Sequence, residues 1–291
     1  MEGWQPAVDL LGEDPEMSRL HRTAALVALV LLPVLAACSS GDPDSAPTPE
    51  PSVSVSSAPP PPAAPAVGSC HRLSFEAAAE PVDSSAAVPC RSTHTSVTTE
   101  VGRLGPLVDG HLLAVDSRTV QAKIAKACPP TLGPYVGGDQ TTQRLSRLKI
   151  VWFSPTVEQA DAGANWFRCD VVGLRSDNRL LALPATMKNV LDAPDALDRF
   201  GTCGTKDPSA RGFQPVACSV RHTWRAIDVV DLPSDARYLD RAASTSAEGD
   251  CKNTASDRAK GALKFEYSFV WPTRAEWATG QRYGYCWVPE R

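Results

Sequence analysis

The sequence has no run of basic residues and no acidic tail. After Cys38 it carries 27 Lys and Arg residues against 28 Asp and Glu residues, so most of the chain is close to neutral. A protein that binds nucleic acid normally needs a basic face that neutralises phosphates. The sequence therefore predicts no nucleic-acid partner, whereas a small ligand or another protein stays open as a partner.

The sequence also lacks an apolar run long enough for a stable transmembrane helix. The segment from Thr23 to Ala37 has fifteen uncharged, mostly apolar residues, and Arg19 and Arg22 precede it. A helix needs roughly 20 residues to cross the hydrocarbon core, so this segment is typical of a signal peptide instead. We predict a signal peptide over residues 1–37. Because residues 1–16 are acidic, we expect Met17 to be the true start.

The predicted signal peptide ends in Leu35-Ala36-Ala37-Cys38, which resembles a lipobox. We expect the Cys38 thiol to accept a diacylglyceryl group, because two acyl chains hold a protein stably on a membrane. The alternative is an ordinary signal peptide with a cysteine there by chance. The expected location is the outer face of the cytoplasmic membrane, with the membrane as a partner through the N-terminal lipid.

A segment rich in Pro, Ser, Ala and Thr follows, and with Cys38 it makes up a predicted linker over residues 38–67. This composition cannot bury a core and favours extended polyproline II. At ~3.1 Å per residue the linker reaches up to roughly 90 Å. We interpret it as a solvated spacer, and a Pro-rich recognition ligand is the alternative.

The eight remaining cysteines fall into two sets of four with similar spacing. The gaps are 20, 38 and 41 residues in the first set and 15, 33 and 35 in the second. In each set a His follows the second cysteine by four residues, at His94 and His222. A Pro-Thr pair precedes the last cysteine of each set, beginning at Pro155 and Pro272. Such self-similarity predicts two homologous modules, residues 68–192 and 198–291.

Hydrophobic periodicity predicts an α+β fold in which each module reads strand, helix, strand, strand. In the first module the predicted elements are 95–104 (strand), 117–127 (helix), 148–153 (strand) and 166–174 (strand). In the second they are 224–232 (strand), 236–251 (helix), 263–271 (strand) and 282–288 (strand).

Exported cysteines of this number indicate disulfides. Eight cysteines allow 105 pairings, and a module that closes on itself leaves three possibilities per copy. We favour the first cysteine with the second and the third with the fourth. Each loop then contributes about 3–4 kcal/mol in the chain-entropy model. The favoured pairs are Cys70–Cys90, Cys128–Cys169, Cys203–Cys218 and Cys251–Cys286.

These cysteine, histidine and Pro-Thr spacings resemble the septum formation domain, which occurs in membrane proteins and lipoproteins of high-GC Gram-positive bacteria. Family members often carry Trp-x-x-Gly-x-Arg before the last cysteine, which here is Trp277, Gly280 and Arg282. The first copy has Ala160 and Asn165 instead of the Trp and Arg. The resemblance implies two divergent copies of the domain and a link to cell division, without a defined chemistry.

His94 with Glu100, and His222 with Asp228, are candidate acid/base pairs or metal ligands. Six residues along one straight strand span about 20 Å, so direct contact within each pair is implausible. We prefer a histidine that binds backbone groups beside a disulfide. A zinc site would need free thiolates in an oxidising compartment, so we expect no metal and no cofactor.

Aromatic side chains alternate near the C-terminus, at Tyr283, Tyr285 and Trp287, so they share one strand face. With Trp277 and Arg282 they are candidate binding residues. If exposed, they would stack on sugars of the cell wall or anchor an envelope protein. If buried, they form the core of a small domain, which is the interpretation that we favour.

The sequence predicts a non-enzymatic binding or scaffolding protein of the cell envelope, linked to septum formation. The alternative is a cell-wall hydrolase or an envelope redox enzyme. Ser146-x-x-Lys149 matches one motif of penicillin-binding proteins, but their Lys-Thr-Gly motif is missing. We therefore predict no catalytic residues.

Overall fold

The computed structural model describes residues 60–105, 107–108, 111–112, 114–260 and 262–290. The predicted signal peptide, Cys38 and most of the predicted linker lie outside these residues. Within the described part of the chain, no helix combines the length and the apolar composition that spanning a membrane requires.

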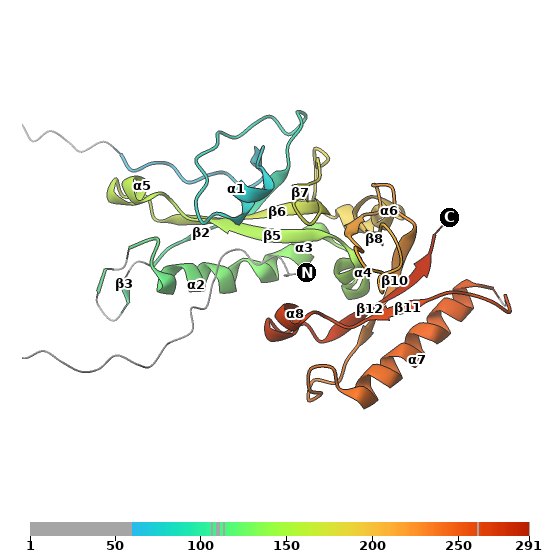
Figure 1. Cartoon of the computed structure of the whole chain (residues 1–291). Helices are drawn as coiled ribbons and strands as arrows, with labels where there is room; N and C mark the ends of the chain where they lie inside the picture. The colour runs from blue at the N-terminus through green and yellow to red at the C-terminus, as the bar shows by residue number, and fades with distance from the viewer. Residues whose placement is uncertain (1–59, 106, 109–110, 113, 261, 291) are drawn as a thin grey trace, which may run out of the picture. The chain divides into compact units, whose positions relative to one another are not determined.

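The first sheet contains three of the strands predicted from the sequence, each within two residues of the expected ends. Its order is β1-β2-β6-β5, with β7 paired to the end of β6, and all pairs are antiparallel. Helices α1 and α2 lie on opposite faces of this sheet (Figure 1). Both faces of β6 are therefore covered, and most of its residues are buried. The strands are β1 (Cys70–His71), β2 (Ser96–Arg103), β5 (Leu148–Phe153), β6 (Trp166–Ser176) and β7 (Arg179–Leu180).

The second sheet has the order β11-β12-β10-β8-β9 and is also antiparallel. Two of its strands, β10 and β12, lie within one residue of the predicted limits. The short strands β8 and β9 were not predicted, because two or three residues carry no readable alternation. The strands are β8 (Thr202–Gly204), β9 (Pro215–Ala217), β10 (Trp224–Asp231), β11 (Ser268–Val270) and β12 (Tyr283–Pro289); a separate hairpin pairs β3 (Leu107–Val108) with β4 (His111–Leu112).

Two longer helices carry the third cysteine of each set: Cys128 is the C-cap of the first, and Cys251 lies inside the second. The predicted helix over 117–127 is confirmed as α2, which begins after the N-cap Ser117. The remaining helices are short. The helices are α1 (Phe75–Ala79), α2 (Arg118–Ala127), α3 (Leu132–Val136), α4 (Gln140–Leu145), α5 (Val157–Asp161), α6 (Ala196–Phe200), α7 (Arg241–Arg258) and α8 (Arg274–Ala278), with 3₁₀ turns η1 (Pro129–Thr131) and η2 (Val190–Asp192).

The predicted limits of α7, residues 236–251, were wrong at both ends. Leu239 has φ 58°, a left-handed conformation that a right-handed helix cannot pass through, so α7 starts after Asp240. The helix continues past Cys251 because Ala255 extends the buried stripe of small residues spaced four apart.

The strand predicted over 263–271 was also too long. The ladder between β11 and β12 pairs only Ser268 to Val270, and Leu263 is fully exposed. A strand needs a partner for its backbone groups, and alternation alone does not provide one. The preceding aromatics Phe265 and Tyr267 contact each other instead, with ring centroids 6.1 Å apart.

The two sheets share a strand order: β1-β2-β6-β5 corresponds position by position to β8-β10-β12-β11. The register shifts at equivalent points, between Thr98 and Glu100 and between Ala226 and Asp228. Helices α5 and α8 both begin at a Thr that forms a capping box after a Pro. We call residues 67–192 the first half and residues 198–290 the second half. Whether the halves are homologous modules stays a prediction.

The four disulfides are the pairs favoured from the sequence. One bridge in each half joins the first strand to the segment that leads into the next long strand, with Cys90 before β2 and Cys218 before β10. The other joins the helical cysteine to a central strand, at Cys128–Cys169 and Cys251–Cys286, and all four of these cysteines are fully buried. Each half is thus closed on itself by covalent bonds.

The halves meet where the end of α4 contacts the segment before β8. The Arg147 amide donates to the Phe200 carbonyl at 2.7 Å, and the Thr202 hydroxyl donates to the Leu145 carbonyl at 2.7 Å. Phe200 and Ala217 belong to the main hydrophobic core of the first half.

Candidate functional site

The candidate acid/base pairs, which the sequence made implausible, do not form, and Asp228 contacts the Val229 amide and the Thr254 hydroxyl instead of His222. His94 is fully buried, and its Nδ1 lies 2.8 Å from the Ser92 carbonyl oxygen, while Glu100 is exposed beyond the register shift. The Nδ1 of His222 lies 2.6 Å from the Val220 carbonyl oxygen. The structure thus supports the interpretation that each histidine binds a backbone group beside a disulfide.

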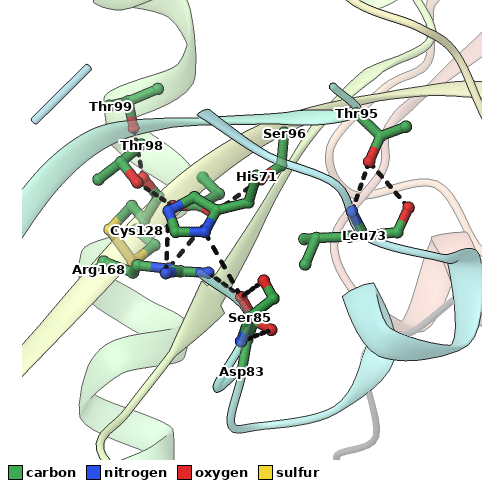
Figure 2. Close-up of polar contacts among 12 residues, drawn as sticks. His71, Leu73, Asp83, Ser85, Thr95, Ser96, Thr98, Thr99, Cys128 and Arg168 are labelled. Atoms are coloured by element: carbon green, nitrogen blue, oxygen red, sulfur yellow. Dashed lines mark hydrogen bonds and ion pairs between the residues drawn. A yellow bond between two sulfur atoms is a disulfide. The ribbon is translucent and has the colours of Figure 1, made fainter. Parts of the chain in front are cut away.

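The structure instead brings together a buried ionic cluster around Arg168, which sequence reasoning missed. Arg168 is 2% exposed, and its guanidinium contacts Asp83 at 2.5 Å, His71 Nε2 at 3.1 Å and Asp170 at 3.3 Å. Figure 2 shows the guanidinium between the His71 ring and the loop that carries Asp83 and Ser85. The only sequence signal is that Arg168 and Asp170, one on each side of Cys169, share one face of a buried strand.

Hydroxyl groups complete this Arg168 cluster. Ser96 and Thr98 on β2 donate to the two carboxylate oxygens of Asp170, at 3.0 and 2.9 Å. The Ser85 hydroxyl and amide donate to Asp83 at 2.8 and 2.9 Å. Both carboxylates therefore have partners, as buried charges require.

Burial shifts two pKa values in this cluster. It raises the pKa of Asp170, and the charge of Arg168 and the hydroxyl of Thr98 act in the opposite direction. Burial, followed by the charge of Arg168, lowers the pKa of His71. A neutral His71 accepts from Arg168 through Nε2 and adds no second positive charge. The contact between Asp83 and Arg168 holds the 81–85 loop against β6. Because the charged groups are enclosed, the cluster offers no reaction site to solvent.

A second group of charges lies beside the Cys203–Cys218 disulfide, and we call Cys203, Cys218, His222, Arg225 and Glu290 the His222 corner. His222 Nε2 lies 3.2 Å from the Glu290 carboxylate, and Arg225 Nε donates to that carboxylate at 2.5 Å. Partial burial opposes ionisation of Glu290, but Arg225 and His222 outweigh it and lower the pKa. Unlike the Arg168 cluster, this corner is partly open to solvent.

The alternating aromatics near the C-terminus contribute to a core. Trp287 is 2% exposed and meets the Phe213 ring edge-to-face at 5.3 Å. The Tyr285 hydroxyl donates to the Arg144 carbonyl at 3.1 Å, and the Arg144 guanidinium lies 4.4 Å above the Tyr283 ring. The stripe therefore packs against α4 of the first half, which supports the core interpretation.

Trp277 and Arg282 form part of a half-buried surface cluster. The Arg282 guanidinium lies 3.9 Å above the Trp277 ring and donates to the Trp277 carbonyl at 2.7 Å. The Trp271 ring stacks on the Trp277 ring, with centroids 5.5 Å apart. The Tyr238 ring meets the Trp277 ring edge-on, with centroids 5.9 Å apart. Arg274 in turn lies 4.9 Å above the Tyr238 ring. We call these five residues the aromatic clasp.

A sequence model of the septum formation family matches residues 67–264 as one stretch that includes parts of both sheets. Neither a curated protein nor a solved structure matches the chain. The family match covers more than half of the sequence and agrees with the resemblance carried by the cysteine and histidine spacings. This chain belongs to the septum formation family.

Proposed function

We propose that the protein is a non-enzymatic binding or scaffolding protein, lipid-anchored on the outer face of the cytoplasmic membrane, and that it acts in septum formation. The observation that carries this proposal is the match to the septum formation family over residues 67–264. In this proposal Cys38 provides the anchor, and the Pro-rich linker separates the folded halves from the bilayer.

The disulfides support an exported location. All eight cysteines from Cys70 to Cys286 are paired. Disulfides persist in oxidising compartments and are rare in the reducing cytosol. The apolar segment before Cys38 supplies a matching export signal, with residues 1–37 as the signal peptide and 38–67 as the lipidated linker.

We also propose that residues 68–192 and 198–291 are homologous modules. Their shared strand order, matching register shifts and identical disulfide pattern support a duplication. Neither half forms its core alone, because Phe200 and Ala217 pack into the core of the first half and Leu145 packs into that of the second. The duplicated halves would therefore act as one folded body on the linker.

The arrangement of polar groups favours binding over catalysis. A general acid or base must lie within hydrogen-bond reach of the substrate. The Arg168 cluster is enclosed, and two surface cavities of about 300 and 460 Å³ are lined by other residues. The aromatic clasp is the better candidate for contact with a partner, because Trp, Tyr and Arg dominate binding energy at protein interfaces. The partner we favour is an envelope protein, and cell-wall glycan is the alternative.

Membrane anchoring is tested with the full chain and the Cys38→Ser variant in the native host. We expect mass spectrometry to find a diacylglyceryl group on Cys38, and the variant to leave the membrane fraction. Depletion of the protein is expected to delay or misplace septa, and only the lipidated chain should restore them. A chain that stays in the cytosol, or normal division after depletion, contradicts the proposal.

Partner binding is tested by crosslinking in cells that carry the Trp277→Ala/Arg282→Ala double variant. The matched control changes the equivalent first-half position, Asn165→Ala. We expect the double variant to lose a crosslinked division protein and the control to keep it. If the pure protein instead releases soluble fragments from cell walls, the hydrolase alternative is correct.

A further inference from the structure

The His222 corner brings three metal-ligating groups together. The Cys203 sulfur, an imidazole nitrogen of His222 and a carboxylate oxygen of Glu290 all lie within 4.8 Å of one another. In a tetrahedral zinc site, bonds of about 2.0–2.3 Å place ligand atoms roughly 3.3–3.8 Å apart. Small side-chain rotations are therefore enough to bring these three atoms to coordination distance.

The hydrogen bonds of His222 leave its Nε2 atom ready to bind a cation. Its Nδ1 lies 2.6 Å from the Val220 carbonyl, which only accepts, so Nδ1 carries the hydrogen. In the neutral ring Nε2 then presents a lone pair to Glu290, 3.2 Å away, which is also an acceptor. Two facing acceptors need a proton or a metal ion between them. Metal-binding histidines typically donate their other N–H to a carbonyl in this way.

We propose that the His222 corner is a latent zinc site that the Cys203–Cys218 disulfide keeps closed. A dithiol reductant transfers two electrons to the disulfide and becomes a disulfide itself, which leaves two thiols at Cys203 and Cys218. Binding of Zn²⁺ then releases both thiol protons to solvent. The four ligands are the Cys203 and Cys218 thiolates, His222 Nε2 and the Glu290 carboxylate, a donor set that suits zinc.

The surrounding charges allow Glu290 to change partner. Arg225 now binds Glu290, but it also pairs with Asp198 at 3.0 Å and donates to the Leu197 carbonyl at 3.3 Å. When zinc takes Glu290, Arg225 keeps these two contacts. The side chain of Glu290 is 34% exposed, so an ion can reach the corner from solvent.

The first half provides an internal control with the same cysteine and histidine spacing. Cys70, Cys90 and His94 correspond to Cys203, Cys218 and His222. Four residues after the last cysteine, however, the first half has Gly173 where the second has Glu290. Among the described residues, no carboxylate groups with His94 and its cysteines. Opening this first bridge should therefore not create a zinc site.

The test uses the full chain with Cys38→Ser, so that no unpaired cysteine interferes. Mild treatment with dithiothreitol is followed by mass mapping that identifies chains with Cys203–Cys218 open, and Co²⁺ then serves as a spectroscopic probe. We expect one Co²⁺ per chain with thiolate charge-transfer absorption, displaced by Zn²⁺, and none in the oxidised chain. His222→Ala and Glu290→Gln should each weaken Zn²⁺ binding by at least about tenfold, and His94→Ala should leave it unchanged. Equal binding by the His222→Ala chain overturns the proposal.

A second variant avoids reductant and keeps the other disulfides. Cys218→Ser leaves the Cys203 thiol free beside His222 and Glu290, and circular dichroism checks that the chain is folded. We expect it to bind Co²⁺ through one thiolate, whereas the matched Cys90→Ser variant, which frees Cys70, should not. A folded Cys218→Ser chain without thiolate–cobalt absorption, or equal absorption in both variants, rejects the site.

Discussion

The equivalent faces of the two sheets carry different kinds of side chain, charged in the first sheet and aromatic in the second. In the first sheet the residues that flank the central-strand cysteine are Arg168 and Asp170, and they join a buried ionic cluster. In the second sheet the equivalent residues are Tyr285 and Trp287, which pack in an aromatic core. The neighbouring strands differ in the same way. On β2, Ser96 and Thr98 donate to Asp170, whereas on β10, Trp224 and Ala226 pack against the aromatic side chains.

The first strands show how each face is filled. His71 in the first half stands where Gly204 stands in the second, one residue after a cysteine. A side chain at Gly204 would clash with the Phe213 ring, so the glycine gives Phe213 room to reach Trp287. In the first half His71 contacts Arg168 instead. The same strand order and disulfide pattern are therefore compatible with a buried ionic cluster or with an aromatic core. The loop that covers the face determines which of the two forms.

The largest expected difference between the two faces is in how the stability losses of two substitutions combine. Arg168→Met leaves Asp83 and Asp170 buried without their cation, and we expect unfolding to become easier by about 3–5 kcal/mol. Adding Asp170→Leu should recover part of this loss, because an apolar pair can replace a buried ion pair at little cost. Urea unfolding with the disulfides intact measures both values.

The matched variants in the second sheet are Tyr285→Ala and Trp287→Ala. Here each truncation leaves a cavity, at a cost of about 3–5 kcal/mol for a buried aromatic, and the second truncation rescues nothing. A Tyr285/Trp287 double variant that recovers stability, or an Arg168/Asp170 double variant that loses more than Arg168→Met alone, would remove the distinction between the faces.

The disulfides should stabilise the fold by an amount that grows with the logarithm of loop length, whichever side chains cover the sheet beside them. The chain-entropy model gives about 4 kcal/mol for the 41-residue loop of Cys128–Cys169 and about 3 kcal/mol for the 15-residue loop of Cys203–Cys218. We expect the double Cys→Ala variant of the first pair to lose more stability in urea than that of the second. The reverse order would show that burial around the sulfurs outweighs chain entropy.

Acid should weaken the first sheet through His71. The pKa of His71 in the folded chain is lowered by burial and by Arg168, whereas an unfolded histidine titrates near about 6.5. Its contribution is complete above pH ~6.5 and is lost as the pH falls toward the folded pKa, because the unfolded chain takes up the proton first. The slope cannot exceed about 1.4 kcal/mol per pH unit for one proton.

His71→Gln provides the comparison, because a Gln oxygen still accepts from Arg168 but does not titrate. Unfolding free energies between pH 7 and pH 5 should fall less steeply in this variant than in the original chain. His222→Gln in the second half serves as the control for histidine loss elsewhere. Identical slopes for His71→Gln and the original chain would show that His71 does not couple acid to folding.

The sequence could predict what depends on local spacing. The three main strands of the first sheet follow from local hydrophobic patterns, and the repeated cysteine spacing limits the pairing to three possibilities per half, of which the favoured one is observed. The length of β11 could not be predicted, because Leu263 and Phe265 alternate with polar residues as well as Phe269 does but have no partner strand. The end of α7 was missed because the buried face consists of small residues with little periodic contrast.

The Arg168 cluster could not be predicted, because it joins residues 71, 83, 168 and 170 across three separate segments. An Arg and an Asp in a strand read as a solvated face until the covering loop is known. The stripe from Tyr283 to Trp287 was predicted to share one face, but its burial depends on α4 of the other half. Contacts between distant segments are thus what local patterns leave undetermined.

The smallest expected difference lies at the aromatic clasp, because the first half has Ala160 and Asn165 in place of Trp277 and Arg282. Arg282→Ala removes a cation–π contact with Trp277 and a hydrogen bond to its carbonyl, so we expect a loss of about 0.5–1 kcal/mol. The equivalent first-half change, Asn165→Ala, removes only a 3.3 Å contact with exposed Arg103 and should cost less than about 0.5 kcal/mol. Urea unfolding of both variants separates the two values. Equal losses would mean that the Trp277–Arg282 pair adds nothing to folding, which would leave partner binding as the reason for its presence.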